Sequence, residues 1–79
     1  MAVPSHLEIP HRWHLIRIET AFVHSPGVEG WIGSWSIYLA PVRPGDVPLR
    51  YGDTDVHKYE VVALGAAKTV ATLVASSLE

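Results

Sequence analysis

Apolar and polar side chains alternate with a period of two along residues 11–24. The even positions carry Ile16 and Ile18, whereas Arg17 and Glu19 occupy the centre of the odd positions. Because successive side chains of a strand point to opposite faces of a sheet, this alternation predicts a half-buried strand. We expect its even face to lie in the core and its odd face to lie outside the core.

A second alternating run covers residues 31–40, where the odd positions hold the large residues Trp31 and Trp35. Its odd face is therefore predicted to be buried. Pro26-Gly27 separates the two runs, and this pair is typical of a tight turn. Proline sets the φ angle of the second turn position, and glycine accepts the positive φ of the third. The two runs are thus expected to form an antiparallel hairpin.

Residues 41–55 are rich in proline and glycine, and the segment Arg-Pro-Gly-Asp at 43–46 is a further turn signal. An irregular loop of this length in a small domain is either functional or wraps the edge of the sheet. Residues 57–64 follow it and carry several residues with high β propensity, so they are predicted to form a third strand. Gly65 is expected to end that strand.

Apolar residues recur at helical spacing over 66–78, which predicts a helix that packs on the sheet. Ala67, Ala71 and Ala75 are four residues apart, and this strip of small side chains permits a close approach to a sheet or to a second helix. Short apolar runs are ambiguous, so a fourth strand over 69–75 remains open as the alternative. The inward-facing residues of the helix are expected to be Ala67, Val70, Ala71, Val74 and Leu78.

The predicted fold is therefore α+β with the order β-β-β-α. It contains a small antiparallel sheet of three strands, or four if 69–75 is extended, and one C-terminal helix on one face of the sheet. Residues 1–79 are expected to form a single domain that starts with a short lead-in over 1–10. The closing pair Leu78-Glu79 is a candidate vector-derived segment, because Leu-Glu often precedes a purification tag.

Composition narrows the classes of function. The chain has 79 residues, is 48% hydrophobic and 18% charged, has a formal net charge of −2 and contains no cysteine. Disulfides, thiolate metal sites and a cysteine nucleophile are thereby excluded, and no cofactor is expected. The Lys and Arg residues are spread along the chain without a basic patch, so nucleic acid is not the expected partner. No window reaches the ~18–20 apolar residues of a membrane span, and no targeting signal opens the sequence, which predicts a cytoplasmic protein without a membrane partner.

The sequence also predicts an association surface. One helix covers only one face of a sheet, and the other predicted face carries several large apolar side chains, more than a monomer comfortably exposes. A domain this small gains from additional buried area, and pairing with a second copy supplies it. The partner is expected to be a second copy of the chain, another protein, or both. The predicted interface residues are Trp13, Leu15, Arg17, Ile32 and Tyr38.

The irregular segment holds weaker candidates for binding. Asp53, Asp55 and His57 alternate, so an extended segment projects all three to one side, where they are weak candidates for holding a divalent ion. The simpler interpretation is that the aspartates bond backbone N–H groups of a loop, since the glycine and the terminal glutamate of a calcium-binding loop are missing. The same loop offers three candidates for ligand binding, which are Arg43, Arg50 and Tyr51.

Motifs for catalysis are weak. Gly33-Ser34-Trp35-Ser36 does not match the Gly-x-Ser-x-Gly pattern of a nucleophile elbow, and no His-Glu-x-x-His zinc motif occurs. The leading hypothesis is a small non-enzymatic protein-interaction module, homodimeric and of the accessory, inhibitor or antitoxin kind. Two alternatives stay open: a small-ligand or metal-binding domain that uses the 41–57 loop, and a minimal enzyme built on His and Asp residues.

Overall fold

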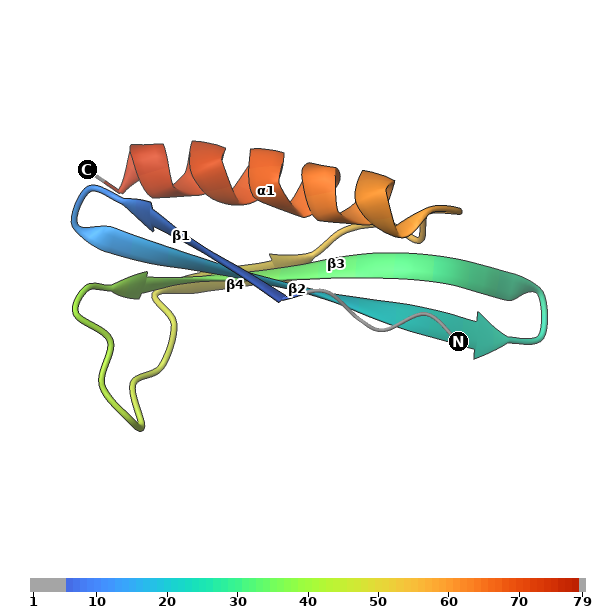
Figure 1. Ribbon diagram of the computed structural model, residues 1–79, viewed down its shortest axis with the longest axis horizontal. Coiled ribbons are helices and arrows are strands. Elements are labelled where there is room, and N and C mark those ends of the chain that lie inside the picture. Colours follow the sequence, from blue (N-terminus) through green and yellow to red (C-terminus); the bar gives the residue numbers. More distant parts are fainter. Residues whose placement is uncertain (1–5, 79) are drawn as a thin grey trace.

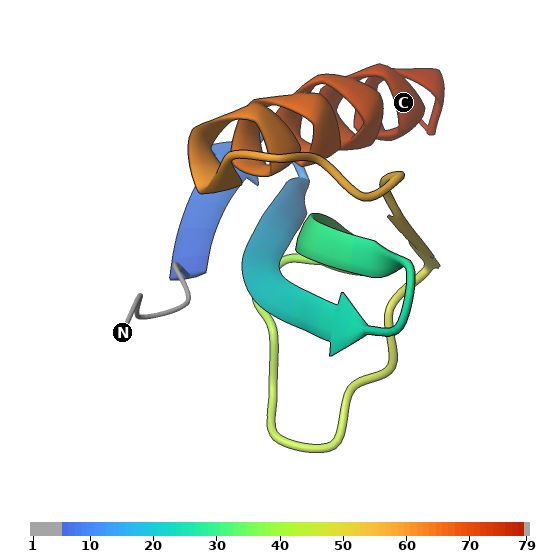
Figure 2. The ribbon, with the colours of Figure 1, turned by 90° about the vertical axis from the view of Figure 1, so that its right-hand side faces the viewer.

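Residues 6–78 are described by the computed structural model, and residues 1–5 and Glu79 lie outside the described residues. The elements are β1 (His6–His11), β2 (His14–Ser25), β3 (Val28–Leu39), β4 (Arg50–Asp53) and α1 (Glu60–Ser77). The strands form one antiparallel sheet in the order β1-β2-β3-β4, and α1 lies along one face of it (Figure 1). The loop between β3 and β4 bends toward the opposite side (Figure 2). The predicted α+β class with one C-terminal helix on an antiparallel sheet is confirmed.

The predicted hairpin forms the centre of the sheet. β2 and β3 pair over their whole length, with Ile18 opposite Trp35 and Thr20 opposite Gly33. The connection is the two-residue turn that Pro26-Gly27 predicts, and Gly27 has a φ of 82°, which a residue with a Cβ adopts only at a cost. The even positions of β2 and the odd positions of β3 face the helix, as the alternation predicts.

The strand predicted over 11–24 is divided in two. Arg12 and Trp13 form a two-residue turn between β1 and β2, with Arg12 at a φ of 55°, so the sheet starts with an extra strand. Trp13, which was expected on a sheet face, therefore lies in this turn and is 74% exposed. Residues 6–11, which were expected to belong to a lead-in, form an edge strand, and an edge strand tolerates Pro10 because one side of its backbone has no partner strand.

β4 lies within the stretch that was predicted to be irregular. It pairs with β3 over only four residues, and the ring of Trp35 lies across Gly52, where a Cβ would come within 2.8 Å of it. The predicted turn at 43–46 is confirmed. The Asp46 N–H donates to the carbonyl of Arg43 (3.1 Å), and the Asp46 carboxylate accepts a bond from the Arg43 N–H (2.9 Å).

Residues 57–64 do not form the predicted third strand. His57 makes a single bridge to Trp31, through N–H to carbonyl bonds of 2.6 and 2.8 Å, and α1 begins at Glu60. The valines of this segment favour extended structure locally, but the packing of the helix on the sheet overrides that preference. Gly65, which was expected to end a strand, lies inside α1.

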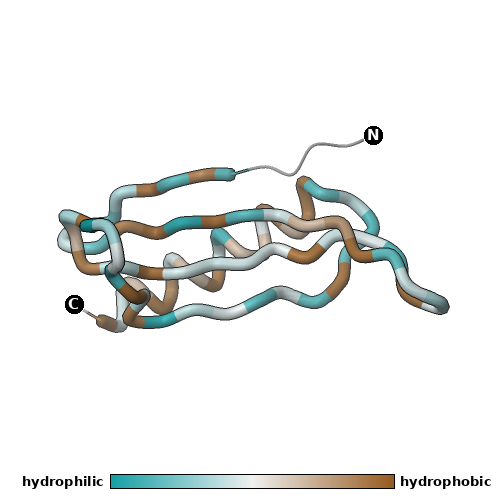
Figure 3. The backbone as a smooth tube through the Cα atoms, turned by 90° about the horizontal axis from the view of Figure 1, so that it is seen from below, coloured by the Kyte–Doolittle hydropathy of each residue, from teal (hydrophilic) through white to brown (hydrophobic). Residues whose placement is uncertain are grey.

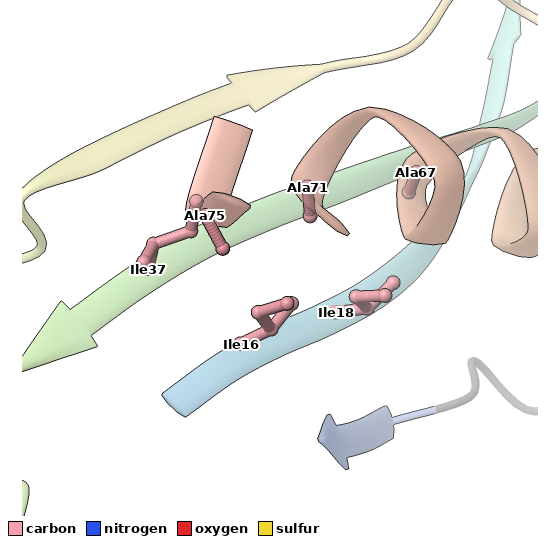
Figure 4. Close-up of a cluster of buried hydrophobic side chains, with 6 residues drawn as sticks. All are labelled: Ile16, Ile18, Ile37, Ala67, Ala71 and Ala75. Carbon is pink, nitrogen blue, oxygen red and sulfur yellow. The ribbon is translucent and has the colours of Figure 1, made fainter. Parts of the chain in front are cut away.

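The core lies between the helix and the inner face of the sheet. Ile16, Ile18 and Ile37 are fully buried there and point toward the helix (Figure 4). Facing them is a strip of four fully buried alanines, Ala63, Ala67, Ala71 and Ala75. The approach is so close that a Cβ added at Gly33 would clash with the carbonyl oxygen of Ala63. The predicted alanine strip therefore packs against the sheet.

α1 excludes the alternative of a fourth strand over 69–75. The predicted inward-facing residues Val74 and Leu78 pack against the core, but Val70 is 41% exposed and faces away from it. Because residues 60–65 are helical as well, α1 reaches 18 residues with a mean hydropathy of 1.3, which is long and apolar enough to cross a membrane by length and composition alone. The expectation that no window has this length and composition is therefore wrong. Of that window, 22% is buried inside the domain.

Candidate functional site

The side chains that point away from α1 form a surface that we call the open face. Its middle is occupied by polar residues, because the strand register aligns them across the sheet. Figure 3 shows the sheet from this side. Arg17 and Glu19 lie at the centre of this face, as the alternation predicts, and the apolar side chains expected on it lie toward its ends, where Leu15 and Ile32 are found. The two polar rows are His6–Glu19–Ser34–Asp53 and Glu8–Arg17–Ser36–Tyr51.

Arg17 is held in place by its neighbours in these rows. Its Nε and Nη2 atoms both lie 2.9 Å from Oε2 of Glu8, and its guanidinium lies 5.1 Å from the centre of the Tyr38 ring. The hydrogen bond to Glu8, together with the negative charges of Glu8 and Glu19, raises the pKa of Arg17 above its ordinary value. The positive charge of Arg17 is thus balanced within the face.

Beside this pair lies a cleft of about 280 Å³ that we call the sheet cleft. Two carboxylates, Glu19 and Asp53, line it together with the hydroxyls of Ser34 and Ser36. Ser34 donates a hydrogen bond of 2.8 Å to Asp53. The remaining lining residues are Arg17, Trp35, Tyr38, Tyr51 and Gly52. The sheet cleft is therefore a polar site with an acidic balance and two phenol rings.

The loop over 41–49 closes one end of the open face. It hangs below the sheet on the side away from α1 (Figures 1 and 2). A second hollow, of about 480 Å³, lies between this loop and the sheet, and Arg17 and Tyr38 line both hollows. The two hollows are thus neighbours on the open face that share Arg17 and Tyr38.

The structure brings some of the predicted site residues together and separates others. Arg17, Tyr38 and Tyr51 all line the sheet cleft, and Leu15 and Arg43 line the adjoining hollow. Ile32 lies farther along the sheet, opposite Ala21, and Trp13 lies in the β1–β2 turn. Arg50 does not face the cleft, because it is opposite Ile37 on the inner side and its Nη1 donates to the carbonyl of Leu49 (2.7 Å).

The three metal candidates do not converge. Asp53 lines the sheet cleft, Asp55 lies in the following exposed loop, and the backbone of His57 is bridged to Trp31. Within residues 6–78, no group of three His, Cys, Asp or Glu side chains is placed to hold a metal ion. The alternation of these residues in sequence is lost because the segment after β4 is not a regular strand.

A second unusual surface is the outer face of α1, which is formed by the residues turned away from the sheet. Leu73 is 67% exposed and Val61 is 73% exposed, and Val62 and Val70 are also exposed. The charged residues of α1 are Glu60 and Lys68, so few charges interrupt this surface. Exposed apolar side chains gathered along one helix usually mark a contact surface.

Sequence reasoning missed Glu19, Ser34 and Asp53 as parts of one cleft, and it did not recognise Val62 and Leu73 as residues of one exposed helix face. The alternation places Glu19 on the same face as Arg17, so that part of the signal was present. The pairing of β3 with β4 could not be recognised in the sequence, because the four residues of β4 include a central glycine and show no strand pattern.

The sequence matches no known protein family, and no curated protein or solved structure is significantly similar to it.

Proposed function

We propose that this protein is a non-enzymatic protein-interaction module that works as a homodimer, with the outer face of α1 as the contact between the two copies. The observation that carries the proposal is the exposure of Val61, Val62 and Leu73 on a helix whose inner face is alanine. The proposal keeps the accessory, inhibitor or antitoxin class and the cytoplasmic location inferred from the sequence. It moves the dimer contact from the open face to the helix.

The outer face of α1 is complementary to itself. Val62, Ala66, Thr69 and Leu73 follow one another at helical spacing along it. When two such helices pack antiparallel about a two-fold axis, Val62 of one copy lies opposite Leu73 of the other, and Ala66 lies opposite Thr69. Small residues then meet where the helices cross, and larger residues fill the space where the helices diverge.

The hydroxyl groups of this helix do not oppose burial. Thr69 donates to the carbonyl of Gly65 (2.9 Å), and Thr72 donates to the carbonyl of Lys68 (2.8 Å). A buried hydroxyl without a partner costs free energy, but these hydroxyls already have partners within their own helix. A second copy can therefore cover the face without leaving them unsatisfied.

The small contact area predicts a weak association. An 18-residue helix is about 27 Å long, and an antiparallel pair of this length buries on the order of 800–1,000 Å² in total. Interfaces of this size are weak and reversible. We expect a dissociation constant on the order of 10 µM, so the dimer forms at high protein concentration and dissociates on dilution.

Sedimentation equilibrium over a wide concentration range tests the proposal. The Leu73→Lys variant is expected to remain monomeric, because antiparallel packing buries the added charge against Val62 of the other copy. Val47→Lys is the matched control, since Val47 is 79% exposed in the β3–β4 loop, and it should dimerise like the wild type. A wild type that is monomeric at all concentrations would overturn the proposal.

A dimer that forms through the open face is the competing arrangement. The Tyr38→Ala variant separates the two, because Tyr38 lies on the open face and not on α1. If Tyr38→Ala abolishes the dimer while Leu73→Lys leaves it intact, the helix contact is wrong and the interface predicted from the sequence is right.

A further inference from the structure

We infer that the sheet cleft is a binding site for an arginine side chain of a partner protein. The inference rests on the proposed function, since it names the partner chemistry of an interaction module. The cleft is lined by residues of the open face, and α1 covers the other face of the sheet (Figure 2). The cleft therefore stays accessible when two copies pair through their helices. A dimer would then present two such clefts, facing away from each other.

The charge of the cleft favours a cation. Arg17 and Glu8 balance each other, which leaves the carboxylates of Glu19 and Asp53 as the net charge of the region. Glu19 lies 3.5 Å from a ring nitrogen of His6 on the β1 side, and no Lys, Arg or His side chain among residues 6–78 forms an ion pair with Asp53. The cleft therefore carries an excess of negative charge.

The spacing of the carboxylates suits a guanidinium. Glu19 and Asp53 flank Ser34 on the two neighbouring strands, so their backbones are about 10 Å apart. A planar guanidinium that lies above Ser34 has donors on opposite edges, and these can bond a carboxylate on either side. The serine hydroxyls lie beneath this position as further polar contacts. The compact ammonium group of lysine reaches one carboxylate at a time.

The aromatic residues supply the remaining part of the site. Tyr51 ends the second polar row on the edge strand β4 and is 77% exposed, so most of its ring is available for contacts from outside. An aromatic face attracts a cation, and a guanidinium also stacks on it. Arg17 already shows this contact within the chain, because it lies over the Tyr38 ring. Tyr51 offers the same contact to a cation from outside.

The test is a nuclear magnetic resonance titration of the isotope-labelled protein with a capped Gly-Ser-Arg-Ser-Gly pentapeptide. We expect saturable shifts of the backbone amides of Ser34, Ser36, Gly52 and Asp53, with weak affinity because one side chain supplies the contact. Two matched peptides serve as controls. Citrulline in place of arginine keeps the shape and removes the charge, and it should not bind; lysine should bind several-fold more weakly.

Variants locate the site. Asp53→Asn keeps the acceptor for Ser34, and with Glu19→Gln it should weaken binding by roughly two- to fivefold per substitution, as expected for exposed charge pairs. Glu29→Gln removes the same charge at the far end of the β2–β3 hairpin and should bind like the wild type. Equal binding of the citrulline peptide, or equal weakening by Glu29→Gln, would overturn the inference.

The titration is repeated with the Leu73→Lys variant, so the two proposals fail separately. Binding of the arginine peptide that persists in this monomeric variant supports the cleft independently of the dimer. A wild type that dimerises but shows no saturable shifts with the arginine peptide refutes the cleft alone. A wild type that binds the peptide but never dimerises refutes the helix contact alone.

Discussion

The inner face of α1 carries alanine, whereas its outer face carries valine and leucine. A surface helix ordinarily buries its large apolar residues and exposes its small or polar ones. Here Ala63, Ala67, Ala71 and Ala75 are fully buried, while Leu73 and Val61 are mostly exposed. The inner face is explained by the close approach of the helix to Gly33. Nothing in the part of one copy that the structure describes requires the large residues outside, and that is why we propose that they contact a second copy.

The largest effect is expected where the inner face is overfilled. Ala67→Leu inserts a larger side chain between α1 and the sheet, where Ala67 is fully buried beside Gly33. We expect the free energy of unfolding to fall by about 3 kcal/mol, which is a large part of the total stability of a small domain. Urea denaturation measures it. Lys68→Leu introduces the same residue one position along on the exposed side and should change the stability by less than about 0.5 kcal/mol.

Substitution by alanine at two glycines is expected to change the free energy of unfolding in opposite directions. Gly33→Ala places a Cβ against the carbonyl oxygen of Ala63, so the helix must move away from the sheet, at a cost of about 2 kcal/mol. Gly65→Ala adds a Cβ where nothing lies within 4 Å, inside the exposed half of α1. It should stabilise the monomer by about 0.8 kcal/mol, because alanine is the better helix former. Equal effects at the two positions would refute the close packing of the inner face.

A smaller effect is expected at the start of the helix. Thr20 on β2 donates a part-buried hydrogen bond of 2.8 Å to the carboxylate of Glu60, which ties the first turn of α1 to the sheet. Thr20→Val should lower the free energy of unfolding by about 1.5 kcal/mol, since it leaves a carboxylate with one partner fewer. Thr72→Val removes a hydroxyl that bonds its own helix, and thermal unfolding should show almost no change.

The central hairpin could be predicted from the sequence because each of its determinants is local. Pro26-Gly27 sets the turn, and the alternation around Ile16 and Ile18 sets the buried face. The helix was placed correctly in type but not in extent. Its N-cap, Tyr59, makes no side-chain cap bond, so the usual start signal is missing.

The sheet cleft could not be predicted, because it depends on contacts between distant segments. Its acidic residues, Glu19 and Asp53, come from strands separated by more than thirty positions, and they meet only through the register of β3. β4 itself is too short to show alternation. The outer face of α1 was missed for a related reason, since the predicted strand over 57–64 removed Val62 from the helix and with it half of the self-complementary pattern.

The smallest predicted effect is a dependence of the stability on protein concentration. It tests the outer face of α1 directly, because it requires no substitution on the inner face. If the outer face joins two copies, association stabilises the folded chain by mass action. Raising the wild-type concentration from about 1 to about 100 µM should add roughly 1 kcal/mol to the apparent stability, or about 4–8 °C in the midpoint of thermal unfolding. The Leu73→Lys variant should show no such shift, because it is expected to remain monomeric. It should still fold, since Leu73 is 67% exposed in one copy and contributes little to its core. A midpoint that is independent of concentration in the wild type would mean that the large residues outside α1 serve no contact between copies, and the contrast between the two faces would then record only how closely the helix packs on the sheet.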